Sequence, residues 1–212
     1  MSIHDIYSKD YAQGYLDSHQ KAKDETYRRQ YWNHFFLNGI INPSVSGNTH
    51  LLEEGGGTCG IWESLSYDRY TSVDLSPEMT ETARLLHGAD KNKEFVLGDI
   101  YSSSLQENSY SAIIANAYGV YYRPDFQHLK RFYDLLKVDG ILFVAIDPMQ
   151  NIKHVLAAPV SGLINKHMRT YTRISSVAFV AMAKKAGFRI WMATDYTPSP
   201  GWDRQAFFLI KD

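Results

Sequence analysis

The sequence predicts an α/β fold built on a mainly parallel sheet, and two patterns along the chain support this prediction. From His50 onward, short apolar runs alternate with segments of helical periodicity, which is typical of βαβ units. The last two apolar runs are separated only by the turn-forming segment 197–201, so we expect the last strand to be antiparallel. The expected strands are 49–54, 69–75, 94–98, 110–116, 140–146, 188–195 and 205–211, and the expected helices are 60–66, 77–88, 125–137 and 174–186.

The composition is that of a globular protein in a reducing compartment. The 212 residues suit one domain with an accessory segment, and apolar residues make up 44% of them. A formal net charge of −1 provides no overall field that would attract nucleic acid or an anionic membrane. Cys59 is the one cysteine, which excludes an internal disulfide. The amino terminus lacks the pattern of a signal peptide and no apolar run is long enough for a membrane span, so we expect a cytoplasmic protein.

The amino-terminal segment predicts a separate helical unit. Its aromatic residues recur three or four positions apart, as at Tyr7, Tyr11 and Tyr15, and the turn-forming segment 42–48 closes the unit. We therefore expect a helical cap over residues 1–48 and a second domain over 49–212.

The first expected strand leads directly into a glycine-rich loop. His50-Leu51-Leu52-Glu53-Glu54 is followed by Gly55-Gly56-Gly57, and a helical pattern comes next. Glycines in this position let the backbone turn tightly and approach a ligand without a clash at Cβ. The same loop is also compatible with a purely structural turn, so it does not define a site by itself.

An acidic residue stands at the end of each of the first three expected strands. Glu53 precedes the glycines and can hold an ammonium group, directly or through water. Asp74 ends the second strand, near the offset of about 20 residues at which an acid takes the ribose hydroxyls of an adenosine cofactor. Asp99 ends the third strand and can accept a hydrogen bond from an adenine amino group, with Ile100 against the ring. Each acid could instead cap a helix that follows its strand. Acids at the ends of three successive strands, together with the glycine loop, favour a nucleoside site.

These residues resemble the first motif of the class I S-adenosylmethionine-dependent methyltransferases, an acid followed by Gly-x-Gly-x-Gly. Glu53, Gly55 and Gly57 match it, whereas Cys59 stands where the third glycine usually lies and Gly60 follows one position later. The likeness covers residues 49–146 best. It implies a Rossmann-like three-layer sandwich with a seven-stranded, mostly parallel sheet whose last strand is antiparallel, preceded by helices. It also implies S-adenosylmethionine as the cofactor and S-adenosylhomocysteine as the product.

The resemblance further assigns roles around the cofactor. It implies that Asp74 holds the ribose, that Leu75 or Met79 flanks the adenine, and that Asp99 and Ile100 recognise the adenine. Further candidates are Asn116 beside the methionine moiety, and Tyr11 and Arg28 near the cofactor carboxylate, with helix packing as the alternative for the last two.

The charges at the loop argue against a dinucleotide. A pyrophosphate is stabilised by a helix N-terminus, and acids at the loop would oppose it. S-adenosylmethionine instead carries a sulfonium and an ammonium group, which suit Glu53 and its neighbours.

The fourth expected strand leads into an aromatic segment that we expect near the methyl acceptor. Tyr118 is a candidate for binding the acceptor, and Tyr121 and Tyr122 for orienting it or contacting the sulfonium methyl; packing is the alternative for each. Many small-molecule methyltransferases have a histidine near the positions of Tyr121 and Tyr122. Without a base here, an acceptor nitrogen or an acidic oxygen is slightly favoured.

A cationic stretch follows the fifth expected strand. No Asp or Glu occurs between Asp147 and Asp195, and residues 149–173 form an insertion before the next helix. We hypothesise that this insertion is a lid for an anionic acceptor, although a solvated basic face is the alternative. The candidates in it are His154 as a base and His167, Arg169 and Arg173 as binding groups.

The sequence thus predicts a methyltransferase acting on a small molecule, as a monomer or homodimer, with no metal, nucleic acid or membrane partner. Methylation of a protein and a catalytically silent S-adenosylmethionine-binding partner subunit are the alternatives. An NAD-type oxidoreductase is disfavoured by the acids at the loop.

Overall fold

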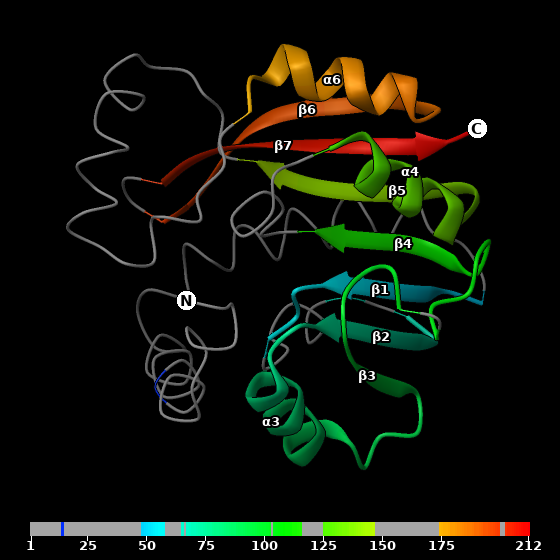
Figure 1. Ribbon diagram of the computed structural model, residues 1–212, viewed down its shortest axis with the longest axis vertical. Coiled ribbons are helices and arrows are strands. Elements are labelled where there is room, and N and C mark those ends of the chain that lie inside the picture. Colours follow the sequence, from blue (N-terminus) through cyan, green and yellow to red (C-terminus); the bar gives the residue numbers. More distant parts are fainter. Residues whose placement is uncertain are drawn as a thin grey trace.

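The computed structural model describes residues 14, 48–57, 65, 67–102, 104–115, 125–146, 174–199 and 202–212. Its described elements are seven strands and three helices, and the chain ends in two consecutive strands (Figure 1). The elements are β1 His50–Glu54, β2 Arg69–Asp74, α3 Pro77–His87, β3 Lys93–Leu97, β4 Tyr110–Ala115, α4 Phe126–Leu135, β5 Leu136–Ile146, α6 Ser176–Lys185, β6 Phe188–Ser199 and β7 Trp202–Lys211.

The strands form one seven-stranded sheet in the order β3-β2-β1-β4-β5-β7-β6. β3, β2, β1, β4 and β5 are all parallel to one another, whereas β7 is antiparallel to both β5 and β6. The prediction of an antiparallel last strand is confirmed. This strand lies between β5 and β6, so the edge of the sheet is β6 and not the last strand of the chain.

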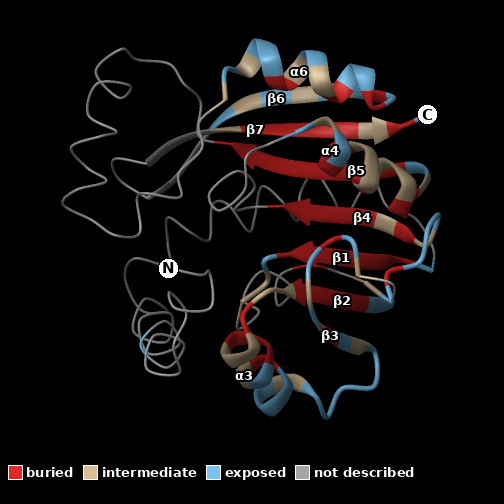
Figure 2. Cartoon of the chain, viewed as in Figure 1, coloured by how far each residue is buried: buried red, intermediate tan, exposed pale blue. Residues whose placement is uncertain are grey.

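Helices cover both faces of the sheet, which gives the three-layer architecture. β1 is buried along its whole length, as expected for a central strand of a parallel sheet (Figure 2). One face carries Leu52 and packs with α4 and α6, while the other carries Leu51 and packs with α3. The helix side chains that reach the sheet core are Leu129, Phe132 and Leu135 of α4, Phe179 and Ala183 of α6, and Ala83 of α3.

The described elements agree with the predicted ones to within two residues except at the start of β5 and in the final hairpin, where β6 continues to Ser199 and β7 begins at Trp202. The sequence predicts a helix to residue 137 and a strand from 140, but α4 ends at Leu135 and β5 begins at Leu136. Leu136 pairs with Tyr110, and its carbonyl accepts a hydrogen bond of 2.7 Å from Lys211 Nζ. These tertiary contacts, which local periodicity does not reveal, favour the extended backbone. Asp139 then turns the chain with a φ of 61°.

The predicted helix 60–66, the cap 1–48 and the insertion 149–173 lie outside the described residues, apart from Gly14, Asn48 and Leu65. Among the described helices, none has the length and apolar character needed to cross a membrane.

A buried histidine lies at the amino end of β1, away from the glycine loop. His50 is 8% exposed, and its Nε2 lies 2.8 Å from Thr71 Oγ1. Burial, together with the charges of Arg69 and Lys137, lowers the pKa of His50 to about 4. His50 is therefore neutral in the folded protein at neutral pH.

Candidate active site

The carboxyl ends of β1, β2, β3 and β4 lie along one edge of the sheet, where the arrowheads of the labelled parallel strands point in Figure 1. Ligands of open α/β sheets bind outside this edge, at the point where the strand order reverses. Here the order reverses between β1 and β4, so the glycine loop after β1 lies at the expected binding position.

The glycine loop has a backbone that few other residues could adopt. Gly55 and Gly57 have φ values of 65° and 56°, and Gly55 N donates a 2.8 Å hydrogen bond to Val73 O at the end of β2. A Cβ at Gly56 would lie 2.2 Å from Ser72 Oγ. All three glycines are thus required, two by their conformation and one by the close approach of β2.

We expect Gly56→Ala to destabilise the protein by about 1–3 kcal/mol because the added methyl group overlaps Ser72. Chemical denaturation measures this change. The double variant Gly56→Ala/Ser72→Ala should recover part of the loss, since it removes the nearest atom and leaves Ser72 Cβ at 3.2 Å and Glu53 Oε2 at 3.4 Å. An undiminished stability of the single variant would contradict the described loop.

Asp74 fastens the glycine loop to the end of β2. Its Oδ2 accepts a 2.8 Å hydrogen bond from Gly57 N, and its Oδ1 accepts one of 2.8 Å from Ser76 N. Burial raises the pKa of Asp74, the two backbone hydrogen bonds lower it, and the charge of Glu54 raises it. Met79 lies beside this loop, with its Sδ 3.9 Å from the position of a Cβ on Gly57.

Glu53 is 5% exposed and faces the same side of the sheet as Leu51. Its Oε2 accepts a hydrogen bond from the Tyr70 hydroxyl. Burial raises the pKa of Glu53 to about 7; the Tyr70 hydrogen bond lowers it and the charge of Asp74 raises it. A buried carboxyl group with this pKa can become an anion when a cation comes close.

The third acid behaves as a loop-forming residue in the structure. Asp99 Oδ1 accepts a 2.8 Å hydrogen bond from Tyr101 N. The Ile100 side chain is fully buried in the core cluster with Leu52 and Val73, and Leu75 is half-buried. The roles predicted for Asp99, Ile100 and Leu75 toward an adenine stay predictions.

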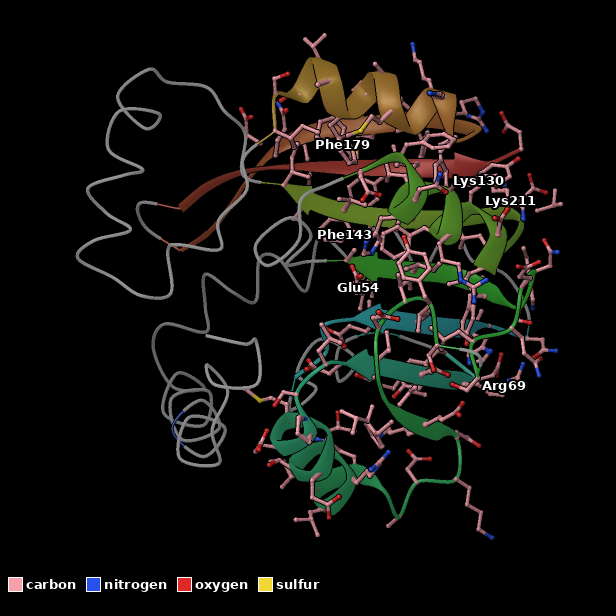
Figure 3. The ribbon with its side chains drawn as sticks, viewed as in Figure 1. Glu54, Arg69, Lys130, Phe143, Phe179 and Lys211 are labelled. Atoms are coloured by element: carbon pink, nitrogen blue, oxygen red, sulfur yellow. The ribbon has the colours of Figure 1, made fainter. Side chains whose placement is uncertain are left out.

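The sequence interpretation missed a second pair at this edge. Glu54 Oε1 accepts a 2.5 Å hydrogen bond from His128 Nε2 of α4, and both side chains are more than nine-tenths buried (Figure 3 labels Glu54). A signal was available in the sequence. A glutamate in a fully buried strand needs a partner, and His128 shares the helical stripe of Leu129 and Phe132.

The remaining predicted site residues lie outside the described residues, and their roles stay predictions. They are Tyr11, Arg28, Cys59, Gly60, Asn116, Tyr118, Tyr121, Tyr122, His154, His167, Arg169 and Arg173. The described part of the chain contains no group of three or more His, Cys, Asp or Glu side chains that could hold a metal ion.

Comparisons with known proteins agree with this geometry. Residues 52–144 match a family model described as a methyltransferase domain, whereas no curated protein sequence matches the chain. Many solved structures share the fold. One, from the complex between the Haloferax volcanii Trm112 methyltransferase activator and a methyltransferase, has a TM-score of 0.69 at 14% identity, covering 96% of this chain and 97% of that one.

Two further structures carry methyltransferase names. A Leishmania major S-adenosylmethionine-dependent methyltransferase has a TM-score of 0.67 at 17% identity, covering 85% of this chain and 72% of that one. Haemonchus contortus phosphoethanolamine N-methyltransferase 2, in complex with phosphomonomethylethanolamine and S-adenosylhomocysteine, has a TM-score of 0.66 at 17% identity. That match covers 85% of this chain, which spans about half (52%) of the other.

The fold is therefore that of the class I, Rossmann-like methyltransferases, and residues 52–144 match a methyltransferase domain. The comparisons support dependence on S-adenosylmethionine, and the described residues fit this cofactor. A loop without side chains leaves room beside Gly55, where a Cβ would meet no heavy atom of the described residues within 4 Å. Buried Glu53 and half-buried Asp74 adjoin the loop and suit a ligand that carries cationic groups.

Proposed function

We propose that this protein methylates a small anionic metabolite at nitrogen or oxygen. The observation that carries the proposal is the acid-lined glycine loop, in which Asp74 is hydrogen-bonded to Gly57 and buried Glu53 lies on the adjacent strand. This arrangement favours a ligand with sulfonium and ammonium charges over one with a pyrophosphate.

In this proposal each of the three acids binds a different part of the cofactor. Glu53 takes the ammonium group, Asp74 the ribose hydroxyls and Asp99 the adenine amino group. Leu75, Met79 and Ile100 supply apolar contacts. Tyr11, Arg28 and Asn116 complete the set near the methionine moiety.

The nature of the acceptor is supported by two observations of different kinds. The stretch from Pro148 to Thr194 contains cations and no acids, which suits a carboxylate or phosphate on the acceptor. One structural neighbour is named as a complex with phosphomonomethylethanolamine, a small amine that bears a phosphate. An amine needs only to be delivered deprotonated and aligned with the methyl carbon, so in this proposal Tyr121 and Tyr122 orient it without a strong base.

Calorimetric titration with S-adenosylhomocysteine and with NAD tests the cofactor part of the proposal. We expect binding of the former only. Transfer of a labelled methyl group from S-adenosylmethionine to a panel of amines and phenols with and without phosphate or carboxylate groups then tests the acceptor. Label that enters only protein substrates would overturn the small-molecule assignment.

We expect Arg169→Ala/Arg173→Ala to raise the KM for an anionic acceptor about tenfold, because each guanidinium can bind the anion with charge-assisted hydrogen bonds. The affinity for S-adenosylhomocysteine should stay unchanged. Lys184→Ala is the control, since Lys184 belongs to the same acid-free stretch but is exposed on α6. An unchanged acceptor KM in the arginine variant would contradict the hypothesis that the insertion 149–173 binds an anionic acceptor.

A partner subunit is the second candidate role, because one structural neighbour comes from a complex with a methyltransferase activator. Binding of S-adenosylhomocysteine without methyl transfer by the purified chain, and transfer only after a partner protein is added, would support this role.

A further inference from the structure

Glu54 connects the glycine loop to α4, which covers the face of the sheet opposite to the one that Glu53 faces. Successive side chains of a strand point to opposite faces, so Glu53 faces Tyr70 whereas Glu54 faces α4. Glu54 is followed immediately by Gly55, whose backbone starts the loop. Its ion pair with His128 therefore attaches the start of the loop to a helix that is distant in sequence.

His128 lies where three segments of this edge meet. Its ring packs against Phe132 of α4 at a centroid distance of 4.9 Å and against Tyr101 at 5.8 Å. Tyr101 lies in the segment that follows β3, two residues after Asp99. The backbone N of His128 donates a 2.8 Å hydrogen bond to Asp125, the N-cap of α4. The His128 side chain thus links α4 to Glu54 at the end of β1 and to Tyr101 in the segment after β3.

The charges facing His128 favour its protonated form. Burial alone lowers the pKa of His128, but the charge and hydrogen bond of Glu54 raise it, and the charges of Asp125 and Asp99 raise it further. The net effect places its pKa above the usual 6.5. Tyr101 is a further titratable group that packs against the ring. This raised pKa widens the pH range over which His128 is an imidazolium beside Glu54.

We propose that Glu54 and His128 are a positioning pair, in which the imidazolium holds the glycine loop against α4 and thereby sets the affinity for the cofactor. This inference rests on the proposed cofactor site at the loop. It assigns the pair no contact with the cofactor: His128 acts through Glu54, and Glu54 acts through the backbone of Gly55.

His128→Gln tests the proposal, because glutamine can still donate a hydrogen bond to Glu54 but carries no charge. Dissociation constants for S-adenosylhomocysteine are measured from pH 6 to pH 10 in both proteins. We expect about tenfold weaker binding in the variant at pH 6. The difference should vanish as the pH rises past the pKa of His128, where the wild-type pair also loses its charge. Glu53 titrates in both proteins, so its effect cancels when the dissociation constant of the variant is divided by that of the wild type at each pH.

Glu54→Gln provides the second arm. Removing the anion lowers the pKa of His128, so the pH at which cofactor binding weakens should move down. A purely structural role for the pair would not shift this pH. His50→Gln is the matched control: it replaces another buried histidine, at the opposite end of β1, and should leave the affinity and its pH dependence as in the wild type.

The two proposals fail in different ways. A wild-type protein that binds no S-adenosylhomocysteine would overturn the cofactor site. Normal binding by wild type together with the same affinity and pH profile in His128→Gln would overturn the positioning pair alone. If His128→Gln does not fold, an unshifted pH profile in Glu54→Gln overturns it instead.

Discussion

Replacing Glu53 with glutamine is expected to stabilise the cofactor-free protein at pH 8 while weakening cofactor binding. Burial raises the pKa of Glu53 to about 7 from an ordinary value of 4.5, so at pH 8 the folded protein holds a buried carboxylate at a cost of up to about 3 kcal/mol. Glutamine avoids this cost and still accepts the hydrogen bond from Tyr70. It cannot offer a charge to an ammonium group, so we expect the dissociation constant for S-adenosylmethionine to rise about tenfold.

The pH dependence of stability distinguishes this explanation from a general packing effect. Because the folded-state pKa of Glu53 is raised, the group favours folding below pH 4.5 and loses this contribution as the pH rises through 7. His50 acts in the opposite direction: its folded-state pKa of about 4 makes stability rise between pH 4 and 6.5. Glu53→Gln should therefore match wild type near pH 4, below the ordinary carboxyl pKa, and exceed it increasingly up to pH 8.

Urea denaturation across this pH range measures the effect. Glu81→Gln is the control, because the Glu81 side chain is 63% exposed on α3 and should change neither stability nor affinity appreciably. A Glu53→Gln protein that is less stable than wild type at pH 8 would refute the buried-carboxylate explanation.

Asp74→Ala is expected to weaken cofactor binding by about 1–3 kcal/mol, through the loss of charge-assisted hydrogen bonds to the ribose. The substitution also leaves the backbone N–H groups of Gly57 and Ser76 without their acceptor, so the loop loses its attachment to β2. We expect the loss for S-adenosylhomocysteine to be as large as that for S-adenosylmethionine, because the ribose is common to both. Calorimetry with each ligand measures it.

Asp90→Ala is a matched control for the loss of a turn-forming aspartate. Asp90 is exposed, and its Oδ1 accepts a 3.0 Å hydrogen bond from Asn92 N in the turn before β3. This variant removes the same kind of contact away from the carboxyl edge, so cofactor affinity should stay at the wild-type level. Equal affinities of Asp74→Ala and wild type would mean that the end of β2 does not bind the ribose.

The parallel sheet and the acids at its edge were predictable because both follow from one-dimensional spacing. Strand ends meet at one edge in any parallel sheet, so Glu53 and Asp74 could be brought together from their positions alone. The partner of Glu54 was harder to predict, since it depends on which side of α4 faces β1. The start of β5 depends on Lys211, which is 75 residues from Leu136. Such contacts are set by the tertiary fold and leave little trace in local periodicity.

The position of β7 has a consequence for the order in which the protein can fold. β6 pairs only with β7 in the described sheet, and β7 in turn pairs with β5. During synthesis the segment from α6 through β6 therefore has no strand to dock on until residues 202–211 have left the ribosome. The five strands before it can assemble earlier. A chain that stops before Trp202 should retain a partial sheet with an unpaired β5, whose apolar edge is a template for aggregation.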